Sequence, residues 1–359
     1  MKLIPDERPA RREDYRRQSF AERYPRILQG TLLECSDSAV VKSVSSLASF
    51  IAGDICLNVP SGLKDSSWQQ LYESAEGFYA TEIDFLKLEY LIFHQILLAH
   101  RYFERLEDPF AGDKRLDVTS AFAQYANILN GLSDLESAFK VSLRGNAHDA
   151  SQVRIATSGT LLDFDPWPTC IDREVVDIIC DNAGHEFLSD LVLAAYILQT
   201  TNSKVRLHVK AMPWFVSDVT LTDAIGVFDA IETSQIRRSN FGSLLSEARE
   251  SQRLQVLDHP QWTRPINFGE GHLIDALRTR GSMVIAKGDL NYRRCLADVS
   301  TEIFKPWQEL SYRPDVAVMS LRSVKSHCLA GVPRKAWPRD LDEDRFPMDG
   351  TLFCFQSIV

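Results

Sequence analysis

Apolar residues in the first part of the chain, from about Ser19 to Arg144, recur at every third or fourth position. This spacing keeps one side of an α-helix apolar, so it predicts amphipathic helices that bury one face. We expect these helices to form a bundle or a cap. The two clearest stripes consist of Phe85, Leu88, Ile92, Ile96, Ala99 and Phe103, and of Val118, Phe122, Tyr125, Leu129 and Leu132.

The pattern changes after a polar stretch at Gly145–Ser151. Short runs of β-branched residues then alternate with segments of helical spacing, which predicts an α/β domain with a mostly parallel sheet and helices on both faces. Between Asn240 and Gly271, the prolines Pro260 and Pro265 indicate a long connection. The predicted strands are Val175–Cys180, Lys204–Val209, Ser282–Ala286, Val316–Leu321 and Thr351–Gln356.

Chain length, net charge and apolar composition limit the classes of protein to which this sequence can belong. With 359 residues, the chain is long enough for two structural units. Its 40 Lys and Arg residues against 49 Asp and Glu residues give a formal net charge of −9, whereas a general nucleic-acid binder normally carries a basic face. The apolar share of 45% is that of a folded globular protein. We therefore expect a folded protein that does not bind nucleic acid.

The cysteines and the apolar runs bear on the cellular compartment. The seven cysteines are scattered and form no C-x-x-C pair, so free thiols in a reducing cytoplasm are the simplest interpretation. The amino terminus is rich in arginine and lacks the apolar core of a signal peptide. The longest apolar stretch, Leu91–Ala99, is interrupted by His94 and Gln95 and has about half the length of a membrane span. We expect a cytoplasmic protein with no membrane partner.

An acid and an amide, Asp181 and Asn182, separate an apolar run from an amphipathic segment. The run Val175–Cys180 has the composition of a buried strand, and the residues from Phe187 to Leu198 have helical spacing. Ligand sites in open α/β sheets form at such strand-to-helix turns. Carboxylate and amide oxygens suit a divalent cation, and the N–H groups at the start of a helix favour phosphate. The turn is therefore a candidate ligand site.

Asp218 is the second polar candidate, and it lies near the carboxyl end of the predicted strand Lys204–Val209. A helix cap is the alternative role. Asp is favoured at the N-cap of a helix, and either Asp218 or Asp223 fits that position before the next helix. Both roles stay open at the level of the sequence.

Polar residues also follow the predicted strand Ser282–Ala286. Gly288 allows the backbone to approach a ligand closely, and Lys287 offers a positive charge for a phosphoryl oxygen. With Asp289 and Asn291, this turn is denser in polar groups than an ordinary surface turn. A surface turn with a capping Asp is the alternative.

The fourth polar segment contains Arg322 and Lys325. Their spacing of three residues would place both cations on one helical face. Two cations near a cluster of acids would balance the charge of a phosphate dianion. The alternative is an ordinary solvent-facing surface of a helix.

Together, these four segments resemble one family, the metal-dependent damage-control phosphatases, in the branch that also contains the proteins called acidic-residue methyltransferases. The resemblance extends over nearly the whole chain, because TLFCFQ near the carboxyl end and ERYPRIL at Glu22–Leu28 also resemble parts of the family. The four segments are DNAGHE at Asp181–Glu186, PWFVSDVT at Pro213–Thr220, KGDLNYRR at Lys287–Arg294 and LRSVK at Leu321–Lys325.

The resemblance implies an N-terminal α-helical domain at residues 1–150, followed at residues 151–359 by a Rossmann-like α/β/α domain with a mostly parallel sheet. It implies an enzyme of metabolite damage control that removes phosphate from sugar phosphates such as fructose 1-phosphate. It also implies a divalent cation held by Asp181, Asn182 and Asp218. Oxygen ligands favour Mn²⁺ or Mg²⁺ and admit Co²⁺ or Ni²⁺ with lower preference.

The resemblance also implies roles for the residues of the four segments. The catalytic residues are Asp181, Asp218, Lys287 and Asp289, and the substrate-binding residues are Asn182, Glu186, Asn291, Arg322 and Lys325. The expected nucleophile is a water activated by the cation, with an aspartyl-phosphate through Asp181 or Asp289 as the alternative. Two departures from the family pattern, at Arg294–Asp298 and at Ser323, leave the substrate preference open.

Three alternative functions stay open. S-adenosylmethionine-dependent methylation of protein carboxylates is attributed to the same branch, but the glycine-rich turn of a nucleotide site is reduced here to Gly184. Asp163 and Asp165 resemble the D-x-D of haloacid-dehalogenase-type phosphatases, although Pro166 follows at once. A binding module without catalysis is the third alternative. His272 is a further candidate for substrate contact.

Overall fold

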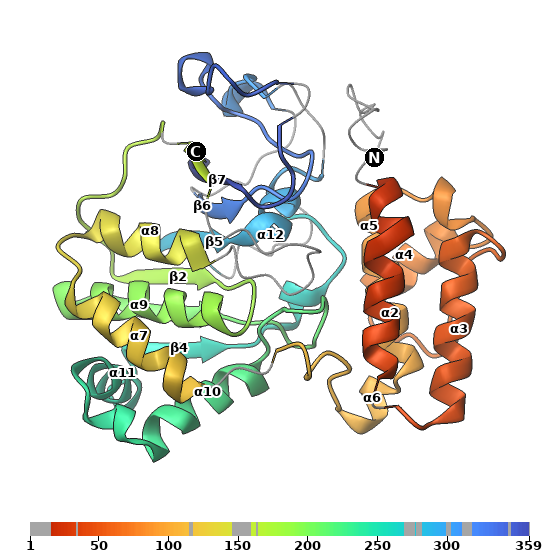
Figure 1. The fold of residues 1–359 in the computed structure, drawn as a ribbon, viewed down its shortest axis with the longest axis horizontal. Coiled ribbons are helices and arrows are strands. Elements are labelled where there is room, and N and C mark those ends of the chain that lie inside the picture. The colour runs from red at the N-terminus through yellow and green to blue at the C-terminus, as the bar shows by residue number, and fades with distance from the viewer. Residues whose placement is uncertain are drawn as a thin grey trace.

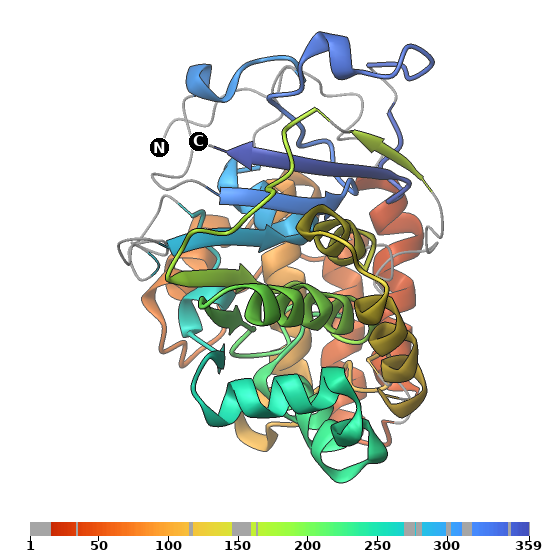
Figure 2. The ribbon, with the colours of Figure 1, turned by 90° about the vertical axis from the view of Figure 1, so that its left-hand side faces the viewer.

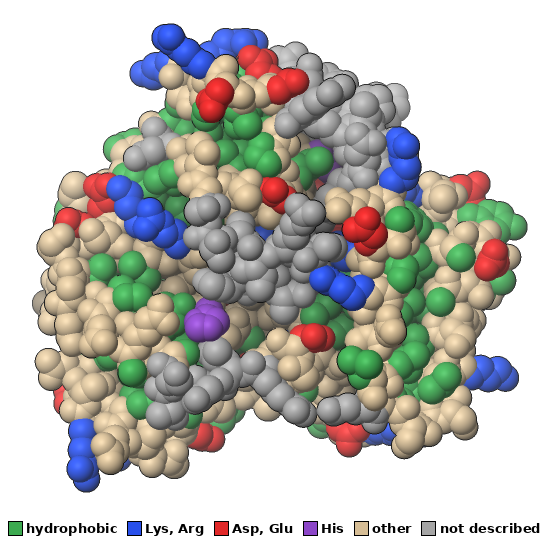
Figure 3. Space-filling view, in the orientation of Figure 1, with side chains coloured by type: hydrophobic (Ala, Val, Ile, Leu, Met, Phe, Trp, Pro, Cys, Tyr) green, Lys and Arg blue, Asp and Glu red, His purple; other side chains and the backbone are tan. Residues whose placement is uncertain are grey.

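A computed structural model describes residues 16–33, 35–114, 118–145, 159–162, 164–268, 277, 282–298, 303–310, 318–343 and 346–358. Two units lie side by side in it, one made of helices and one built around a β-sheet (Figure 1). Two candidates from the sequence, Asp163 and His272, lie outside the described residues, as does the polar stretch after Gly145. Acidic and basic side chains are interspersed over the described part of the face in Figure 3.

Helix α5 is the centre of the helical unit. Its predicted apolar stripe is confirmed from Phe85 to Ala99, and the helix is apolar on its other sides as well, so that Leu91 and Phe93 are fully buried. The stripe ends earlier than predicted, since Phe103 lies on the next helix and is exposed. The helices of this unit are α2 (Tyr24–Leu32), α3 (Ser38–Ala52), α4 (Ser66–Ala75), α5 (Phe85–Ala99) and the short α6 (Tyr102–Arg105).

Local sequence signals define the ends of these helices. Asp37 begins α3 by accepting hydrogen bonds from the N–H groups of Ala39 and Val40, and Asp65 caps α4 in the same way. Helix α3 ends at Gly53, whose φ of 84° lies in the left-handed region that favours glycine. In the part of the chain that the structure describes, none of the helices has the length and apolarity needed to cross a bilayer.

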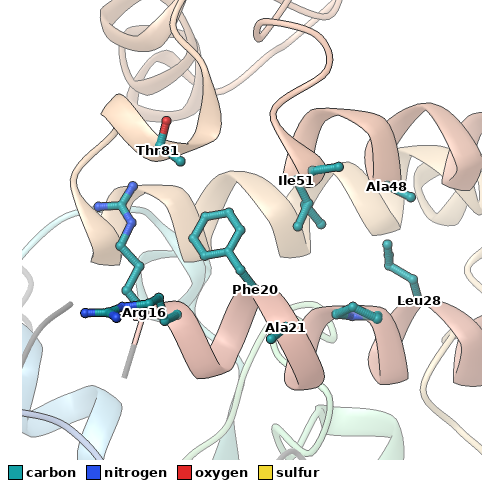
Figure 4. Close-up of a pocket in the computed structure, with 10 residues that line it drawn as sticks. Arg16, Phe20, Ala21, Leu28, Ala48, Ile51 and Thr81 are labelled. Carbon is teal, nitrogen blue, oxygen red and sulfur yellow. The ribbon is translucent and has the colours of Figure 1, made fainter. Parts of the chain in front are cut away.

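A cavity of about 680 Å³ opens in the helical unit between α2 and α3 (Figure 4). Phe20, Leu28 and Ile51 line it, and Arg16 lies at one end. The guanidinium of Arg16 donates hydrogen bonds to the backbone carbonyl of Ala80, at 2.6 Å, and to a second carbonyl nearby. All the lining residues belong to the helical unit, so the cavity is separate from the polar strand ends of the sheet.

The second unit contains a seven-stranded sheet with the strand order β1-β7-β6-β5-β2-β3-β4. Every neighbouring pair is parallel except β6 and β7, which confirms the predicted mostly parallel sheet. The strands are β1 (Thr160–Leu162), β2 (Val175–Ile179), β3 (Lys204–His208), β4 (Leu254–Leu257), β5 (Ser282–Lys287), β6 (Val318–Ser323) and β7 (Leu352–Ile358).

Helices cover both faces of the sheet, as an α/β/α architecture requires. Helices α7, α8 and α9 pack on one face, and α12 packs on the other face against β5 and β6 (Figures 1 and 2). The central strands are therefore buried on both sides, which explains their continuous apolar runs. The helices of this unit are α7 (Val118–Asn130), α8 (Leu135–Gly145), α9 (His185–Thr200), α10 (Leu221–Thr233), α11 (Asn240–Glu250) and α12 (Gly288–Cys295).

The packing of α7 and α8 differs from the predicted division of the chain at residue 150. Phe122 and Phe139 of these helices share one hydrophobic core with α9 and the sheet, whereas α2 to α5 surround a separate core. Gly145 shows how close the contact is, because a Cβ atom there would lie 1.9 Å from Oγ of Ser189 on α9. By their packing, α7 and α8 belong with the sheet, and the helical unit ends before α7.

Two further expectations are corrected by the structure. The region from Asn240 to Gly271 is not a simple connection, because it contains α11 and the edge strand β4. Arg322 lies on β6 and not on a helix, so it does not share a helical face with Lys325. Strand β1, with three residues, is too short to give a pattern in the sequence. All seven cysteines are free, as predicted.

A buried ionic network joins the helical unit to α12. Glu89 on α5 accepts a hydrogen bond from Arg23 at 2.5 Å and another from Arg293 at 2.6 Å, and Arg293 also pairs with Asp298 at 2.6 Å. Burial raises the pKa of the Glu89 carboxyl, but Arg293 and Arg23 outweigh this effect and hold the pKa below its ordinary value. Helix α12 also carries Asp289, one of the polar residues that follow the strands of the sheet. The network therefore fixes the position of this helix relative to the helical unit.

We expect Glu89→Gln to lower the free energy of unfolding by about 3–5 kcal/mol, because it removes the buried anion shared by Arg23 and Arg293, of which Arg293 keeps Asp298. Urea unfolding at pH 7 measures this loss, with Glu104→Gln as the control because Glu104 pairs with Arg101 at an exposed site. The control should change stability by less than about 1 kcal/mol. Since the pKa of Glu89 is lowered on folding, its contribution should fade as the pH falls below the unfolded-state pKa. Equal losses in the two variants would contradict this assignment.

Candidate active site

Two polar turns meet where the order of the strands reverses. From β2 the chain passes through α9 to β3 on one side, and it later returns to place β5 on the other side of β2. Helices α9 and α12, which follow β2 and β5, lie on opposite faces of the sheet (Figure 1). Open α/β sheets bind ligands at such a switch point, outside the carboxyl ends of the strands. Asp181 follows β2 there, and Gly288 follows β5.

Gly288 brings the two turns into contact. A Cβ atom at this position would lie 1.8 Å from Oδ2 of Asp181, so any other residue would collide with the carboxylate. The φ of Gly288 is +81°, in the left-handed region that other residues avoid. The expected close approach of the backbone is therefore present, and the group that it approaches is Asp181.

Backbone bonds join the PWFVSDVT segment to the turn after β2. The N–H of Val219 donates to the carbonyl of Asp181 at 2.9 Å, and the N–H of Ala183 donates to that of Ser217 at 2.7 Å. Asn182 and Asp218 form an isolated antiparallel bridge between these bonds. As a result, Asp181, Asn182 and Asp218 lie together, and all three side chains are buried.

Asp218 is not the cap of the helix that follows it. Thr220 is the N-cap of α10 and forms a capping box with Asp223, which excludes the capping role for Asp218. One oxygen of Asp218, Oδ2, accepts the N–H of Phe215 at 3.2 Å. Burial raises the pKa of the Asp218 carboxyl above its ordinary value, although Lys210 opposes this shift.

Lys210 is a component of the cluster that the sequence analysis missed. Its ammonium lies 3.5 Å from Oδ1 of Asp218 and 3.9 Å from Oδ1 of Asp181, and its side chain is 0% exposed. The sequence did contain a signal, because Lys210 is a polar residue directly after the apolar strand that ends with His208 and Val209. The two carboxylates thus each direct an oxygen toward the same positive charge.

The donor set fits a divalent cation of the Mg²⁺ or Mn²⁺ type. Two carboxylates and one amide supply hard oxygen atoms, and Oδ1 of both acids already faces a cation. The amide nitrogen of Asn182 donates to Glu186 at 2.8 Å, while its Oδ1 accepts from Ser217 and keeps a second lone pair. Among the described residues, no group of three or more His, Cys, Asp or Glu side chains could hold a metal ion, so the fit here depends on two carboxylates and one amide.

Lys287 lies in a second buried cluster. Its ammonium donates to the backbone carbonyl of Ser142 at 2.6 Å and to Asp190 at 2.7 Å, and lies 3.4 Å from Glu186. Burial lowers the pKa of Lys287, but Asp190 and Glu186 outweigh it and raise the pKa above its ordinary value. Burial raises the pKa of Asp190 to about 6, with Lys287 limiting the shift. Because Glu186 in turn accepts from Asn182, this cluster orients a predicted metal ligand.

Asp289 accepts the hydrogen bonds of a third cluster of buried polar groups. Arg322 donates to its Oδ1 at 2.7 Å, and the backbone N–H of Lys325 donates to the same oxygen at 3.3 Å. The guanidinium of Arg322 also lies over the ring of Tyr292, 3.3 Å from its centroid. Asn291 donates to the carbonyl of Lys287 at 2.7 Å. Of the two predicted phosphate-binding cations, the fully buried guanidinium of Arg322 pairs with Asp289, whereas Lys325 reaches Asp289 through its backbone N–H.

Two histidines of the sheet unit have structural partners. Nε2 of His208 lies 2.7 Å from a carboxylate oxygen of Asp177, a buried residue of β2 that also pairs with Arg206. Nδ1 of His185 lies 3.3 Å from the hydroxyl of Tyr125 on α7. Each of these two imidazoles thus has a side-chain partner within the sheet unit.

Comparisons with known proteins identify one family that this chain resembles in sequence. The family described as "Damage-control phosphatase ARMT1-like domain" matches residues 63–337, which include all four polar segments. The curated relatives are called "Damage-control phosphatase ARMT1". The bovine one is 27% identical over 288 residues, covering 75% of this chain and 62% of the relative. The zebrafish one, from Danio rerio, is 32% identical over 166 residues, covering 44% of this chain and 37% of the relative.

A solved structure of a DUF89 family protein from Pyrococcus horikoshii matches with a TM-score of 0.48 and 16% identity, covering 92% of this chain and 98% of that one. The rat relative is 26% identical over 280 residues, and the match covers 61% of its length. The chain thus spans less than two thirds of the length of these mammalian relatives. Because the family match extends over more than half of the chain, this protein belongs to the damage-control phosphatase ARMT1-like family.

Proposed function

We propose that this protein is a metal-dependent phosphatase that hydrolyses phosphate monoesters of sugars and related small metabolites, such as fructose 1-phosphate. The observation that carries the proposal is the contact between Gly288 and Asp181, which joins an acidic turn to the start of α12 at the switch point of the sheet. Membership of a damage-control phosphatase family supports the same reaction class. S-adenosylmethionine-dependent methylation is the alternative, and titrations with S-adenosylmethionine and with Mn²⁺ separate the two.

In this proposal, Asp181, Asn182 and Asp218 hold the divalent cation, most favourably Mn²⁺ or Mg²⁺. When bound, such a cation neutralises charge on the phosphoryl oxygens and favours the ionised form of an attacking water. The protein contributes by holding the three ligands in place before the substrate arrives. Ser217 fixes the carbonyl oxygen of the Asn182 amide, and Glu186 fixes its nitrogen. This arrangement would leave the amide oxygen of Asn182, and not its nitrogen, available to a cation.

The starts of two helices supply positive potential for the phosphate. Helix α9 begins at His185 after the turn of Asp181, and α12 begins at Gly288. The N–H groups in the first turn of a helix carry about half a positive charge and favour a bound anion. Phosphoryl transfer requires mainly such charge stabilisation and an aligned nucleophile. The two helix starts therefore support an anionic substrate.

Asp289 and Asn291 are proposed to contact the hydroxyl groups of the substrate. Arg322 and the backbone of Lys325 hold one oxygen of Asp289 in place. Asn291 is buried, and its Oδ1 accepts no hydrogen bond from the described residues. A buried acceptor that lacks a hydrogen bond destabilises the protein by about 1–3 kcal/mol. A sugar hydroxyl that donates a hydrogen bond to Oδ1 of Asn291 would remove this cost. Lys287 supports the site indirectly through Glu186.

Asp181→Asn should reduce phosphate release from fructose 1-phosphate by about 10³-fold or more, because it removes a charged ligand without changing the shape of the side chain. Calorimetric titration with Mn²⁺ should show a parallel loss of binding, and EDTA should abolish activity in the wild type. Asp163→Asn is the comparison, since Asp163 would be the nucleophile of a haloacid-dehalogenase-type enzyme. Loss of activity in Asp163→Asn but not in Asp181→Asn would contradict the proposal.

Gly288→Ala should lower kcat by about 100-fold, because the added Cβ displaces the Asp181 carboxylate from its position. Gly226→Ala on α10 is the matched control. No atom lies within 4 Å of its Cβ position, so activity should stay at the wild-type level. Steady-state kinetics with saturating Mn²⁺ and circular dichroism of both variants make the comparison. Wild-type kcat in a folded Gly288→Ala variant would rule out the contact as an essential feature.

A further inference from the structure

Lys210 is a buried cation whose hydrogen-bonding capacity is unused among the described residues. Its side chain is 0% exposed, and its ammonium forms no hydrogen bond with any described group. The distances of 3.5 Å to Asp218 and 3.9 Å to Asp181 exceed the usual length of a charge-assisted hydrogen bond, about 2.7–2.9 Å. The three N–H donors are thus paired with the acids by charge but make no short hydrogen bond, which is unfavourable at a buried site unless a ligand engages them.

Another buried lysine shows what purely structural pairing looks like in this chain. The ammonium of Lys114 lies 2.7 Å from Asp108 and 3.0 Å from Asp223, so both carboxylates are at hydrogen-bonding distance. Its side chain is nearly as buried as that of Lys210, at 3% exposure. The acids beside Lys114 are partly exposed, at 18% and 23%, whereas those beside Lys210 are buried, at 8% and 2%. The more deeply buried lysine is thus the one whose ammonium lies farther from its acids.

The charges of the cluster indicate what that ligand is. Asp181 and Asp218 contribute two negative charges, which a divalent cation alone would neutralise. Lys210 adds one positive charge, so the centre with a cation bound is positive by one unit. A net positive, largely dehydrated centre attracts an anion much more strongly than a neutral one, because the interior has a low effective dielectric constant. A tetrahedral oxyanion with several acceptor oxygens matches three unused donors.

We propose, on the basis of the proposed phosphatase function, that Lys210 binds the phosphoryl group and makes this centre selective for anionic substrates. In the protein without a metal, the same ammonium lies between the two carboxylates and reduces their repulsion. Lys210 acts as a binding residue for the phosphoryl oxygens, in addition to the cation held by the acids. Its position at the end of β3 places this charge beside the turn that follows β2.

Binding of inorganic phosphate to the Mn²⁺-loaded full chain tests this role by calorimetry. Lys210→Met should weaken phosphate binding by at least about tenfold, the effect of one lost charge-assisted hydrogen bond. Its affinity for Mn²⁺ should stay equal or rise, because a competing cation is removed. Lys204→Met, which removes a lysine charge at the exposed start of the same strand β3, is the control and should bind both ligands like the wild type. Should Lys210→Met fail to fold, Lys210→Gln keeps polar character without the charge and should show the same loss.

The outcomes distinguish this inference from the function on which it rests. If the wild type binds Mn²⁺ and phosphate, and the Lys210 variants bind phosphate equally well, the inference is wrong and the proposed phosphatase stands. A wild type that binds no Mn²⁺ overturns the proposed metal centre and this inference with it. A Lys210→Met variant that loses Mn²⁺ and phosphate binding together would also overturn it, because the lysine would then only hold the acids in place.

Discussion

The contact between the carboxylate of Asp181 and the backbone of Gly288 is the constraint on which the site depends. It exists because β2 and β5 are neighbours although a long stretch of chain separates them. The contact forces the turn after β2 against the start of α12, and only a glycine with a positive φ permits it. The proposed metal ligands from one half of the sheet and polar groups from the other half therefore lie at the same strand edge.

Buried charges hold this arrangement in place around the contact. Lys287 lies between Asp190 and Glu186, and Arg322 pairs with Asp289, with all of these groups withdrawn from water. Buried ion pairs contribute little net stability, since desolvation offsets much of their attraction. These ion pairs fix the positions of the side chains instead, because each pair has only one low-energy arrangement. Such a concentration at strand ends is typical of a site in which catalysis depends on preorganised charge.

The sequence was sufficient to identify polar residues at the ends of the strands. It was not sufficient to predict which elements the helices pack against. Asp181 and Asp289 could be found because the carboxyl ends of parallel strands meet at one edge of a sheet. Arg322 was assigned to a helix, since a short apolar run that ends in polar residues is ambiguous between strand and helix. Ser142 and Asp190 could not be found, because they meet only through the packing of α8 on α9. Amphipathic spacing tells which face of a helix is buried but not which element covers it, so the packing of α7 and α8 on the core of the sheet could not be predicted.

The most direct test of the account is anomalous X-ray diffraction from crystals grown with Mn²⁺ and inorganic phosphate. The account predicts one manganese peak in contact with the side-chain oxygens of Asp181, Asn182 and Asp218. It also predicts phosphate density on that ion, near the ammonium of Lys210 and the start of α12. Manganese bound at a different position, or phosphate bound away from these residues, would contradict the central claim that the switch point of the sheet is the phosphatase site.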